Sequence, residues 1–600
     1  MKLTDYIVSF FEKQGVQDVF MLSGGGCMHL INSFGSSRKM RYWCLHHEQA
    51  VAMATEAYGR FTQKLGVCVV TCGPGATNTI TGLLGAYQDS SPCVFISGQA
   101  KRAQTVHNCG INGLRQFGQQ EVDIIPIVSS ITKYAVMINK PEEIRYHLEK
   151  AVYLARNGRP GPVWIDVPLD VQNSEIDENN LKGFVPVPQA MRATDAEIRM
   201  MADLIQVSRR PVIVAGQGVR IAGACEELKQ LVEQYDIPVV NSFLGIDVLD
   251  GESKCNIGRI GVKGSRAGNF TLQNADLVIA IGSRLSVSSI GFQPEYFARE
   301  AKVVVVDIDE AEHKKNMVRI DQLVLADAKD VIVSLATYLK KNSSSMRPFS
   351  RWLETANRWK DKFSVFLPQY EDDSQGINYY KFIDLLNANL CKEMPVVADA
   401  GSAFYVTSQA IHLKEDERYV PSGALATMGY TLPAAIGIAV ANEGRPVIGI
   451  TGDGSLQQNI QELVVMRAHH LPVKLFVMNN EGYLSIRTSQ RKFFKDNFVA
   501  EGPKSGVFFP ETSAIAEAYG LNYYKLDTIE KAKALLPKIL EDSEPVVIEV
   551  MTLPFQEIIP STASTVRQDG SMVSKPMEDM YPFMDRETFQ QEMIVRPVNE

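Results

Sequence analysis

Runs of mostly β-branched and other apolar residues recur along the whole chain, and several of them end in glycine-containing turns. Continuous apolar runs of this length are typical of parallel strands buried on both faces. They predict strands at Val67–Cys72, Cys93–Gly98, Pro162–Val167, Pro211–Ala215, Ile237–Val240, Ala275–Ile281, Val303–Ile308, Pro395–Ala398, Val447–Thr451, Val473–Met478 and Pro545–Val550. Helix-length stretches lie between them, for example Glu48–Thr62, Ala224–Tyr235 and Gln457–His470. This alternation predicts an α/β protein with three doubly wound parallel-sheet domains.

Two polar segments divide the chain. Asn173–Arg192 follows a strand, is polar and contains proline, and Lys340–Pro348 carries a run of lysine, asparagine and serine. Both compositions are typical of linkers. We therefore expect domains at 1–175, 193–340 and 365–555. Residues 556–600 show little periodicity and no strand pattern, so we expect a C-terminal arm packed over another domain, with a disordered tail as the alternative.

Composition narrows the class of protein. The 600 residues are 45% apolar and 22% charged, which is enough to build several buried cores. A net charge of −8 argues against nucleic acid or a membrane surface as partner. The nine cysteines are scattered, no apolar run approaches the roughly 20 residues of a membrane helix, and no signal segment opens the chain. We expect a cytoplasmic protein with reduced thiols.

One local motif points to chemistry. Gly452-Asp453-Gly454-Ser455 ends one predicted strand, and Asn479-Asn480 ends the next. The carboxyl ends of parallel strands face one crevice, where ligands bind. Asp453, Asn480 and a nearby backbone carbonyl would give Mg²⁺ an oxygen cage that leaves room for two phosphate oxygens. We expect the glycines to admit a diphosphate, and a helix beginning near Gln457 to direct its N-terminus at it. Gly-Asp-Gly alone is a common turn, but the matching Asn480 favours the metal site.

The order of further motifs carries a resemblance that spans residues 1 to about 555. The chain contains His47-Glu48-Gln49, Gly73-Pro74-Gly75-Ala76-Thr77-Asn78, Gly158-Arg159-Pro160-Gly161-Pro162, Met428-Gly429-Tyr430 and Leu432-Pro433-Ala434-Ala435. With the Gly452 and Asn479 motifs, these resemble the acetolactate (acetohydroxyacid) synthase branch of the thiamine-diphosphate enzymes. The resemblance implies a pyrimidine-binding, a central and a diphosphate-binding domain.

The same resemblance implies roles for individual residues. Glu48 would hydrogen-bond the cofactor pyrimidine ring, so that the ring nitrogen removes the thiazolium C2 proton. We expect burial to favour the neutral form of Glu48. Gly25 and Gln120 would lie beside the reacting centre. The remaining cofactor contacts would be Pro74, Asn78, Gly401, Ser402, Ala403, Ala426, Met428, Gly454 and Ser455, and Mg²⁺ would be held by Asp453, Asn480 and Gly482.

In this family the central domain holds FAD. The positions that resemble the FAD contacts are Arg159, Gly216, Gly218, Lys263, Arg284, Asp307 and Asp327. Gly216-Gln217-Gly218 by itself is weak evidence for a dinucleotide, because the third glycine of the usual fingerprint is missing. A central domain that kept its shape without flavin is therefore the alternative.

The chain departs from the family on the substrate side. Pro168-Leu169-Asp170 stands where many family members have Pro-Lys-Asp, and Arg284 is followed by Leu285-Ser286-Val287-Ser288 in place of an Asp-Arg pair. Two cationic side chains are thus missing, and each would give a substrate carboxylate about 1.5–3 kcal/mol. Arg487 is a candidate replacement. The tail, with Asp569-Gly570-Ser571, resembles synthase-like proteins of surface-polysaccharide biosynthesis.

The resemblance implies a carboligase. It would decarboxylate pyruvate and join the hydroxyethyl unit to a second 2-oxo acid, as in branched-chain amino-acid synthesis. The alternatives are a keto-sugar nucleotide as acceptor and a flavin-dependent pyruvate oxidase. A non-catalytic binder is disfavoured by intact Glu48, Asp453 and Asn480, and an NAD dehydrogenase by the lack of a catalytic His or Lys near the Gly216 turn. The family forms homodimers or homotetramers, and a small regulatory subunit is left open.

Overall fold

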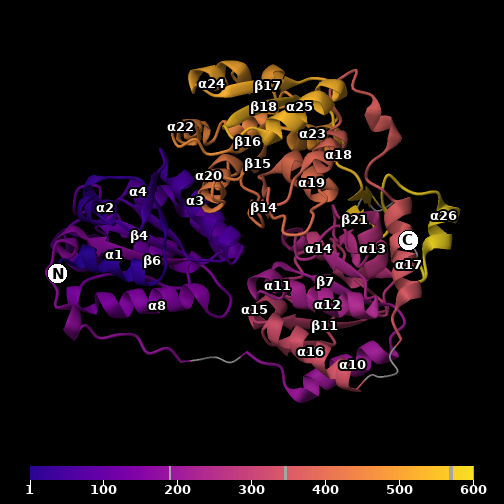
Figure 1. The fold of residues 1–600 in the computed structure, drawn as a ribbon, viewed down its shortest axis with the longest axis horizontal. Coiled ribbons are helices and arrows are strands. Elements are labelled where there is room, and N and C mark those ends of the chain that lie inside the picture. Colours follow the sequence, from indigo (N-terminus) through magenta and orange to yellow (C-terminus); the bar gives the residue numbers. More distant parts are fainter. Residues whose placement is uncertain (188–190, 343–346, 567–571, 599–600) are drawn as a thin grey trace.

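Three parallel sheets organise the molecule, and each contains six strands (Figure 1). The computed structural model describes residues 1–187, 191–342, 347–566 and 572–598. The first sheet has the order β2-β1-β3-β4-β6-β5, the second β12-β11-β10-β7-β8-β9 and the third β14-β13-β15-β16-β18-β17. All strand pairs within them are parallel. The prediction of three doubly wound α/β domains is confirmed.

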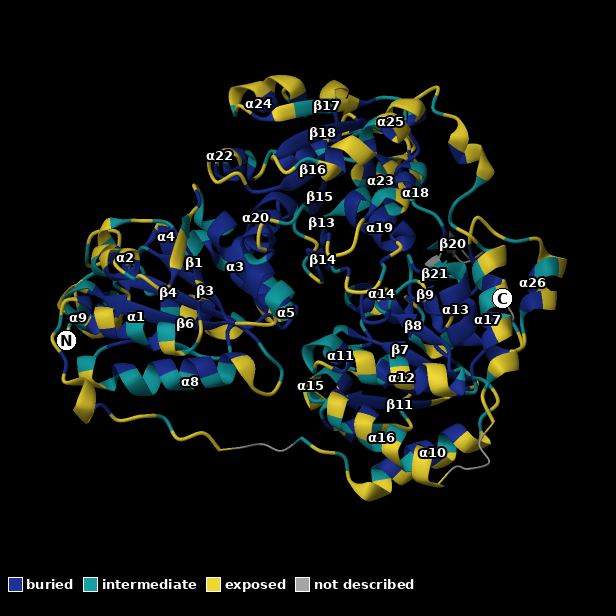
Figure 2. Cartoon of the chain, viewed as in Figure 1, coloured by how far each residue is buried: buried dark blue, intermediate teal, exposed yellow. Residues whose placement is uncertain are grey.

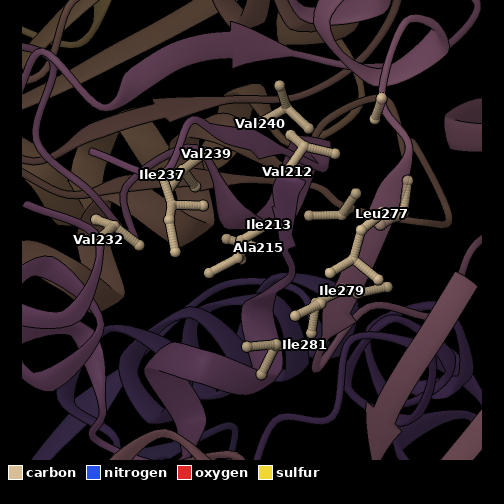
Figure 3. Close-up of a cluster of buried hydrophobic side chains, with 14 of the residues drawn as sticks. Val212, Ile213, Ala215, Val232, Ile237, Val239, Val240, Leu277, Ile279 and Ile281 are labelled. Carbon is tan, nitrogen blue, oxygen red and sulfur yellow. The ribbon is translucent and has the colours of Figure 1, made fainter. Parts of the chain in front are cut away.

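The predicted apolar runs are the interior strands. Each becomes a strand whose ends lie within two residues of the prediction: β3 (Gly66–Val70), β4 (Cys93–Gln99), β6 (Val163–Pro168), β7 (Pro211–Ala215), β8 (Val239–Asn241), β10 (Leu277–Ile281), β11 (Lys302–Asp307), β13 (Val396–Ala398), β15 (Val447–Gly452), β16 (Val473–Asn479) and β18 (Val546–Met551). Figure 3 shows apolar side chains of β7, β8 and β10 meeting in the core of the second domain.

Sequence patterning missed mostly edge strands. These are β2 (Arg41–Cys44), β5 (Ala135–Met137), β9 (Asn256–Arg259), β12 (Gln322–Leu325), β14 (Tyr419–Pro421) and β17 (Asn522–Leu526), together with the short interior strand β1 (Asp18–Met21). Several edge strands keep exposed side chains, as β2 does along most of its length. An edge strand pairs with only one other strand and has one edge exposed to solvent, so it does not need a continuous apolar run.

Helix α3 (Glu48–Thr62) joins the first domain to the third. It begins and ends where the sequence predicts and packs against α20 (Thr431–Ala441), and both helices are almost wholly buried (Figure 2). A Cβ on Gly437 of α20 would lie 2.3 Å from the carbonyl oxygen of Ala54, so this crossing requires glycine. The first and third domains therefore share one apolar core.

The predicted helix Gln457–His470 is wrong. The structure has α21 (Asp453–Leu456), a 3₁₀ turn at Ile460–Glu462 and α22 (Leu463–Ala468). Asn459, between them, leaves helical geometry and donates its side-chain amide to the carbonyl of Gly429 at 2.7 Å. This tertiary contact interrupts the helical pattern, and the helical turn at the motif begins at Asp453 instead of near Gln457.

The C-terminal arm packs over the second domain and contains strands, which the sequence pattern did not predict. Strand β19 (Ser561–Thr562) pairs with β22 (Met580–Tyr581), and β20 (Ser564–Val566) pairs with β21 (Met572–Ser574). After them, α26 (Arg586–Glu592) contributes Phe589 to the second core. Glu592 accepts a hydrogen bond from Trp359 Nε1 at 2.7 Å. These strands are too short to carry an apolar period. The Asp569-Gly570-Ser571 motif lies outside the described residues.

Within the described ranges, no helix combines the length and apolarity needed to cross a membrane.

Candidate active site

Asp453 and Asn480 meet at the carboxyl edge of the third sheet. Strands β15 and β16 are neighbours in register, with Gly452 opposite Met478, so the residues that follow them are brought together. Asp453 Oδ1 accepts a hydrogen bond from the Gly454 N–H at 2.7 Å, and Oδ2 accepts one from the Gly482 N–H at 3.0 Å. The three residues predicted to hold a metal therefore lie in one corner.

The electrostatics of this corner fit a hard cation. Burial raises the pKa of Asp453 to about 6, against the lowering effect of its backbone hydrogen bonds. Asn480 is 5% exposed, and its Oδ1 is buried without a hydrogen-bond partner among the described residues. A carboxylate whose charge is disfavoured by burial and an amide oxygen without a hydrogen-bond donor are oxygen ligands of the kind that Mg²⁺ prefers. A Cβ on Gly482 would lie 2.1 Å from the Glu501 carbonyl, so only glycine fits there.

The residues predicted to line a diphosphate flank this corner. Gly401, Ser402 and Ala403 open α19 (Gly401–Ala410), directly after β13, the neighbour of β15. Gly401 has φ +59°, which favours glycine. A Cβ on Gly454 would lie 2.3 Å from the ring of Tyr483. The open backbone and the free N–H groups at the start of α19 suit a phosphate group.

Asp399, which sequence reasoning missed, organises this wall. It is fully buried and accepts hydrogen bonds from Ser455 Oγ at 2.5 Å and Thr451 Oγ1 at 2.8 Å. Ser455 Oγ in turn accepts the Gly429 N–H at 2.8 Å. The Ser455 hydroxyl is therefore committed to the protein framework. A carboxylate at the end of β13, next to Gly401, is the signal that could have identified Asp399.

A buried ion network fixes the segment that carries Ala426 and Met428. Arg60, on α3, pairs with Glu56 at 2.9 Å and Asp89 at 3.1 Å, and it donates to the Pro421 carbonyl at 2.5 Å and the Tyr430 hydroxyl at 2.6 Å. Asp89 Oδ1 also accepts the Ala424 N–H at 3.0 Å. The first domain thus holds both ends of the 421–430 segment.

The residues predicted on the first domain gather at the edge of its sheet. Glu48 opens α3, and its Oε2 accepts a hydrogen bond from Asn78 Nδ2 at 2.9 Å. Pro74 is the first residue of α4 (Pro74–Asn78). A Cβ on Gly73 would lie 2.4 Å from the carbonyl of Gln120, which itself has φ +56°. Gly25 begins a 3₁₀ turn whose flanking glycines pack on Thr71 and Cys72.

Glu48 is only half-buried, and in the described residues no hydrogen bond or ion pair links it to the Asp453 corner.

A buried carboxyl group supports the Gln120 segment. Asp166, on β6, accepts hydrogen bonds from Ser97 Oγ at 2.6 Å and Gln99 Nε2 at 3.0 Å. The same Gln99 amide donates to the carbonyl of Val122 at 2.8 Å. Burial raises the pKa of Asp166 to about 7. Sequence reasoning missed this residue, because it lies inside an apolar strand without a motif.

A cavity of about 720 Å³ opens between the three domains at the carboxyl edge of the second sheet. It is lined by five of the seven predicted flavin contacts, Arg159, Gly218, Arg284, Asp307 and Asp327, and also by Ala426. Gly216 lies outside the lining. A Cβ there would lie 2.0 Å from the Gly282 carbonyl, so glycine at this position allows close backbone packing. Lys263 also lies outside, 5.4 Å from the ring centre of Tyr405.

Two of the three arginines that line this cavity are already paired with carboxylates, and the third, Arg156, donates to Gln14 Oε1 at 3.2 Å. Arg159 contacts Asp309 at 2.9 Å and Glu312 at 2.6 Å, and Arg284 contacts Glu312 at 3.2 Å. Burial opposes the charge of Glu312, but hydrogen bonds from Lys315 and Arg159 lower its pKa to about 2. The cavity is large enough for a dinucleotide, and Arg159 and Arg284 are balanced by carboxylates.

Arg487 does not replace the missing substrate-side cations. Its Nε pairs with Glu501 at 2.5 Å, and the rest of the guanidinium donates to the carbonyls of Asn480, Glu481 and Pro554. The side chain is 6% exposed. Its hydrogen bonds stabilise the turn after β16. The expectation that Arg487 receives a substrate carboxylate is therefore wrong for this structure.

Comparisons with known proteins place these features among thiamine enzymes. Residues 1–127 match the N-terminal TPP binding domain of thiamine pyrophosphate enzymes, 198–335 their central domain and 399–550 their C-terminal TPP binding domain. An acetolactate synthase large subunit of Lactococcus lactis is 32% identical over 94% of either chain. A probable acetolactate synthase large subunit of Methanocaldococcus jannaschii is 33% identical over 93% of either chain. Acetolactate synthase 2, chloroplastic, of Zea mays is 31% identical over 94% of this chain and 87% of its own.

Proposed function

The chain belongs to the acetolactate synthase family of thiamine-pyrophosphate-dependent enzymes, and we propose that it decarboxylates pyruvate and transfers the remaining two-carbon unit to a second 2-oxo acid. The observation that carries this proposal is the corner at Asp453, where the orphaned Asn480 Oδ1 adjoins a buried carboxylate. That corner suits Mg²⁺, and the start of α19 beside it suits the diphosphate that Mg²⁺ would bridge.

We assign the chain's own residues as follows. Asp453 and Asn480 would hold the metal with the Gly482 backbone, while Gly401, Ser402 and Gly454 would leave room for the diphosphate. Met428 and the Ala426 carbonyl would contact the cofactor. When bound, thiamine diphosphate supplies a nucleophilic carbon that adds to a 2-oxo acid and accepts the electron pair left by CO₂.

Glu48 would hydrogen-bond the pyrimidine ring, and Asn78 Nδ2 orients its carboxylate by a hydrogen bond of 2.9 Å. Because no hydrogen bond or ion pair among the described residues links Glu48 to the Asp453 corner, we propose that a second copy of the chain completes the site in a homodimer or homotetramer. The relatives are named large subunits, and on that basis we add a small subunit as a partner.

We further propose that the 720 Å³ cavity holds FAD. Support comes from its size, its place at the carboxyl edge of the second sheet, and the five lining residues that resemble flavin contacts. The charges of Arg159 and Arg284 are already balanced by carboxylates. Their main role would therefore be to position the flavin and not to neutralise its phosphates.

A keto-sugar acceptor is the second candidate, and the state of Arg487 favours it. With Leu169 and residues 285–288 uncharged and Arg487 turned to Glu501, these positions offer an acceptor carboxylate no free cation. A neutral carbonyl acceptor does not need one.

The test supplies purified protein with thiamine diphosphate, Mg²⁺ and ¹³C-labelled pyruvate, and follows CO₂ release and products by NMR. Acetolactate supports the 2-oxo acid acceptor. CO₂ release without acetolactate keeps the donor and directs the search to keto-sugars. Oxygen uptake with peroxide release assigns an oxidase instead. If pyruvate is not consumed, the proposed donor is wrong.

A further inference from the structure

A second cavity, of about 400 Å³, lies between the second and third domains. Parts of β8, β9, α13 (Arg266–Gln273) and α17 (Ser350–Lys362) line it, together with the segment that follows α19. None of the residues assigned above to thiamine diphosphate, Mg²⁺ or flavin lines this cavity. Its polar lining includes Asn241, Asn256, Arg259, Lys360, Asp361, Gln409 and His412.

The basic side chains of this cavity have no acidic partner. Among the described residues, Arg259, Lys360 and His412 form no ion pair, in contrast to the buried Arg60 and Arg487. The Arg259 guanidinium donates to the carbonyls of Gln409, at 3.3 Å, and Ile411. Lys360 Nζ donates to the carbonyl of Asn256 at 2.8 Å. All these acceptors are neutral, and Asp361, the carboxylate in the described lining, forms no ion pair with Arg259 or Lys360.

The nearby carboxylates offset this charge only in part. Asp361, which itself lines the cavity, and Asp250 raise the pKa of Lys360, and Glu252 raises that of His412. Asp250 is already paired with Lys229 at 3.0 Å. Within the described part of the chain, none of the three carboxylates reaches ion-pair distance of the basic groups of the cavity.

The pKa values show the same excess of positive charge. Burial lowers the pKa of Arg259 to about 10. Burial and then the charge of Arg259 lower the pKa of Lys360, and burial followed by Lys360 and Arg259 lowers that of His412. Cations held close together in a low-dielectric cavity disfavour each other, and a bound anion relieves this cost.

Two buried polar atoms of the lining have no partner. Arg259 Nε is a donor without an acceptor, and Asn241 Oδ1 is an acceptor without a donor, again among the described residues. Asn241 is 1% exposed. Buried groups of this kind are normally satisfied, and a ligand that carries an acceptor oxygen and a hydroxyl group would satisfy both. Phe363, Val365 and Phe366 add an apolar wall for its carbon skeleton.

We propose that this cavity binds a small phosphorylated sugar or polyol, with its phosphate on Arg259 and Lys360 and a hydroxyl group on Asn241. A phosphate group suits paired basic side chains, and 400 Å³ accommodates a sugar phosphate. Arg259 also binds the carbonyls at the carboxyl end of α19, and the opposite end of that helix carries Gly401 and Ser402. Occupancy would therefore stabilise the helix from which the diphosphate wall begins.

The test is isothermal titration calorimetry of the full chain saturated with thiamine diphosphate and Mg²⁺, which keeps the probe out of the diphosphate site. The probes are glucose 1-phosphate, inorganic phosphate and glucose. We expect glucose 1-phosphate to bind more tightly than inorganic phosphate, and glucose not to bind. Arg259→Met and Lys360→Met should each weaken glucose 1-phosphate binding by roughly tenfold or more, as the loss of a charge-assisted hydrogen bond implies.

Lys254→Met is the matched control. It removes the same charge two residues from Asn256, but Lys254 is 62% exposed and paired with Asp236, so binding should not change. If Arg259→Met fails to fold, Lys360→Met decides, since Lys360 donates to a single carbonyl. The proposal is overturned if glucose 1-phosphate binds no better than glucose, or if both variants bind it as the unmodified protein does. Pyruvate turnover is measured in a separate experiment. If the proposed activity fails, the binding of glucose 1-phosphate can still be interpreted.

Discussion

Arg60 offers the sharpest test of how the first and third domains are held together. Replacing it with methionine keeps the aliphatic packing but leaves Glu56 and Asp89 buried without a cation, and both are almost fully enclosed. Removing one partner of a buried ion pair costs about 3–5 kcal/mol. Because the Pro421 carbonyl and the Tyr430 hydroxyl also lose their donor, we expect Arg60→Met to cost at least the upper part of this range.

The cost should depend on pH in a defined direction. Burial raises the pKa of Asp89 to about 6, although the charge of Arg60 opposes this. A carboxyl group with a raised pKa stabilises the fold at low pH, and this contribution is lost as pH rises through the folded-state pKa. Without Arg60 that pKa rises further, so the variant should recover stability toward pH 5 and be weakest near pH 8.

The assay is urea denaturation of Arg60→Met and the unmodified protein at pH 5.5 and pH 8. Lys314→Met is the control, because Lys314, just after a short helix, and Glu310, its first residue, are exposed partners, and the loss of this pair should cost less than about 1 kcal/mol. We also expect pyruvate decarboxylation to fall in Arg60→Met, since the 421–430 segment loses its anchor. A destabilisation below about 1 kcal/mol at pH 8 would show that the network does not hold the domains together.

Three further outcomes follow from the site. Glu48→Gln should retain thiamine diphosphate but lose exchange of its C2 proton with deuterium by NMR; unimpaired exchange would remove Glu48 from the proposed role. Asn480→Ala deletes the orphaned amide oxygen, so Mg²⁺-dependent cofactor binding, measured by calorimetry, should weaken by roughly 10–100-fold; unchanged affinity would place the metal elsewhere. Burial raises the pKa of Asp166 to about 7. Its protonated form therefore stabilises the fold below about pH 4, and this contribution to the free energy of unfolding, up to about 4 kcal/mol, is lost as pH rises to about 7. The stability of Asp166→Asn relative to the unmodified protein should therefore rise between pH 4.5 and pH 7.5, and parallel pH profiles would contradict the assignment.

The sequence by itself determined the three sheets and the corner at Asp453. Short continuous apolar runs that end in turn residues are typical of interior parallel strands buried on both faces, and the carboxyl ends of such strands share an edge. Asp453 and Asn480 follow two such runs, so their meeting required no knowledge of distant contacts. The edge strands lay beyond this reasoning, because one wet side removes the apolar pattern that would reveal them.

Tertiary structure decided which polar groups are free. Ser455 and Arg487 look available in the sequence, but Asp399 and Glu501 already bind them. The helix predicted from Gln457 breaks because Asn459 bonds to a residue 30 positions away. The cavity at Arg259 likewise exists only where two domains meet. A local pattern determines strands and helices. The partner of a polar side chain is set by tertiary contacts with residues that are distant in the sequence. Those contacts decide whether the side chain can bind a ligand or stabilises the fold.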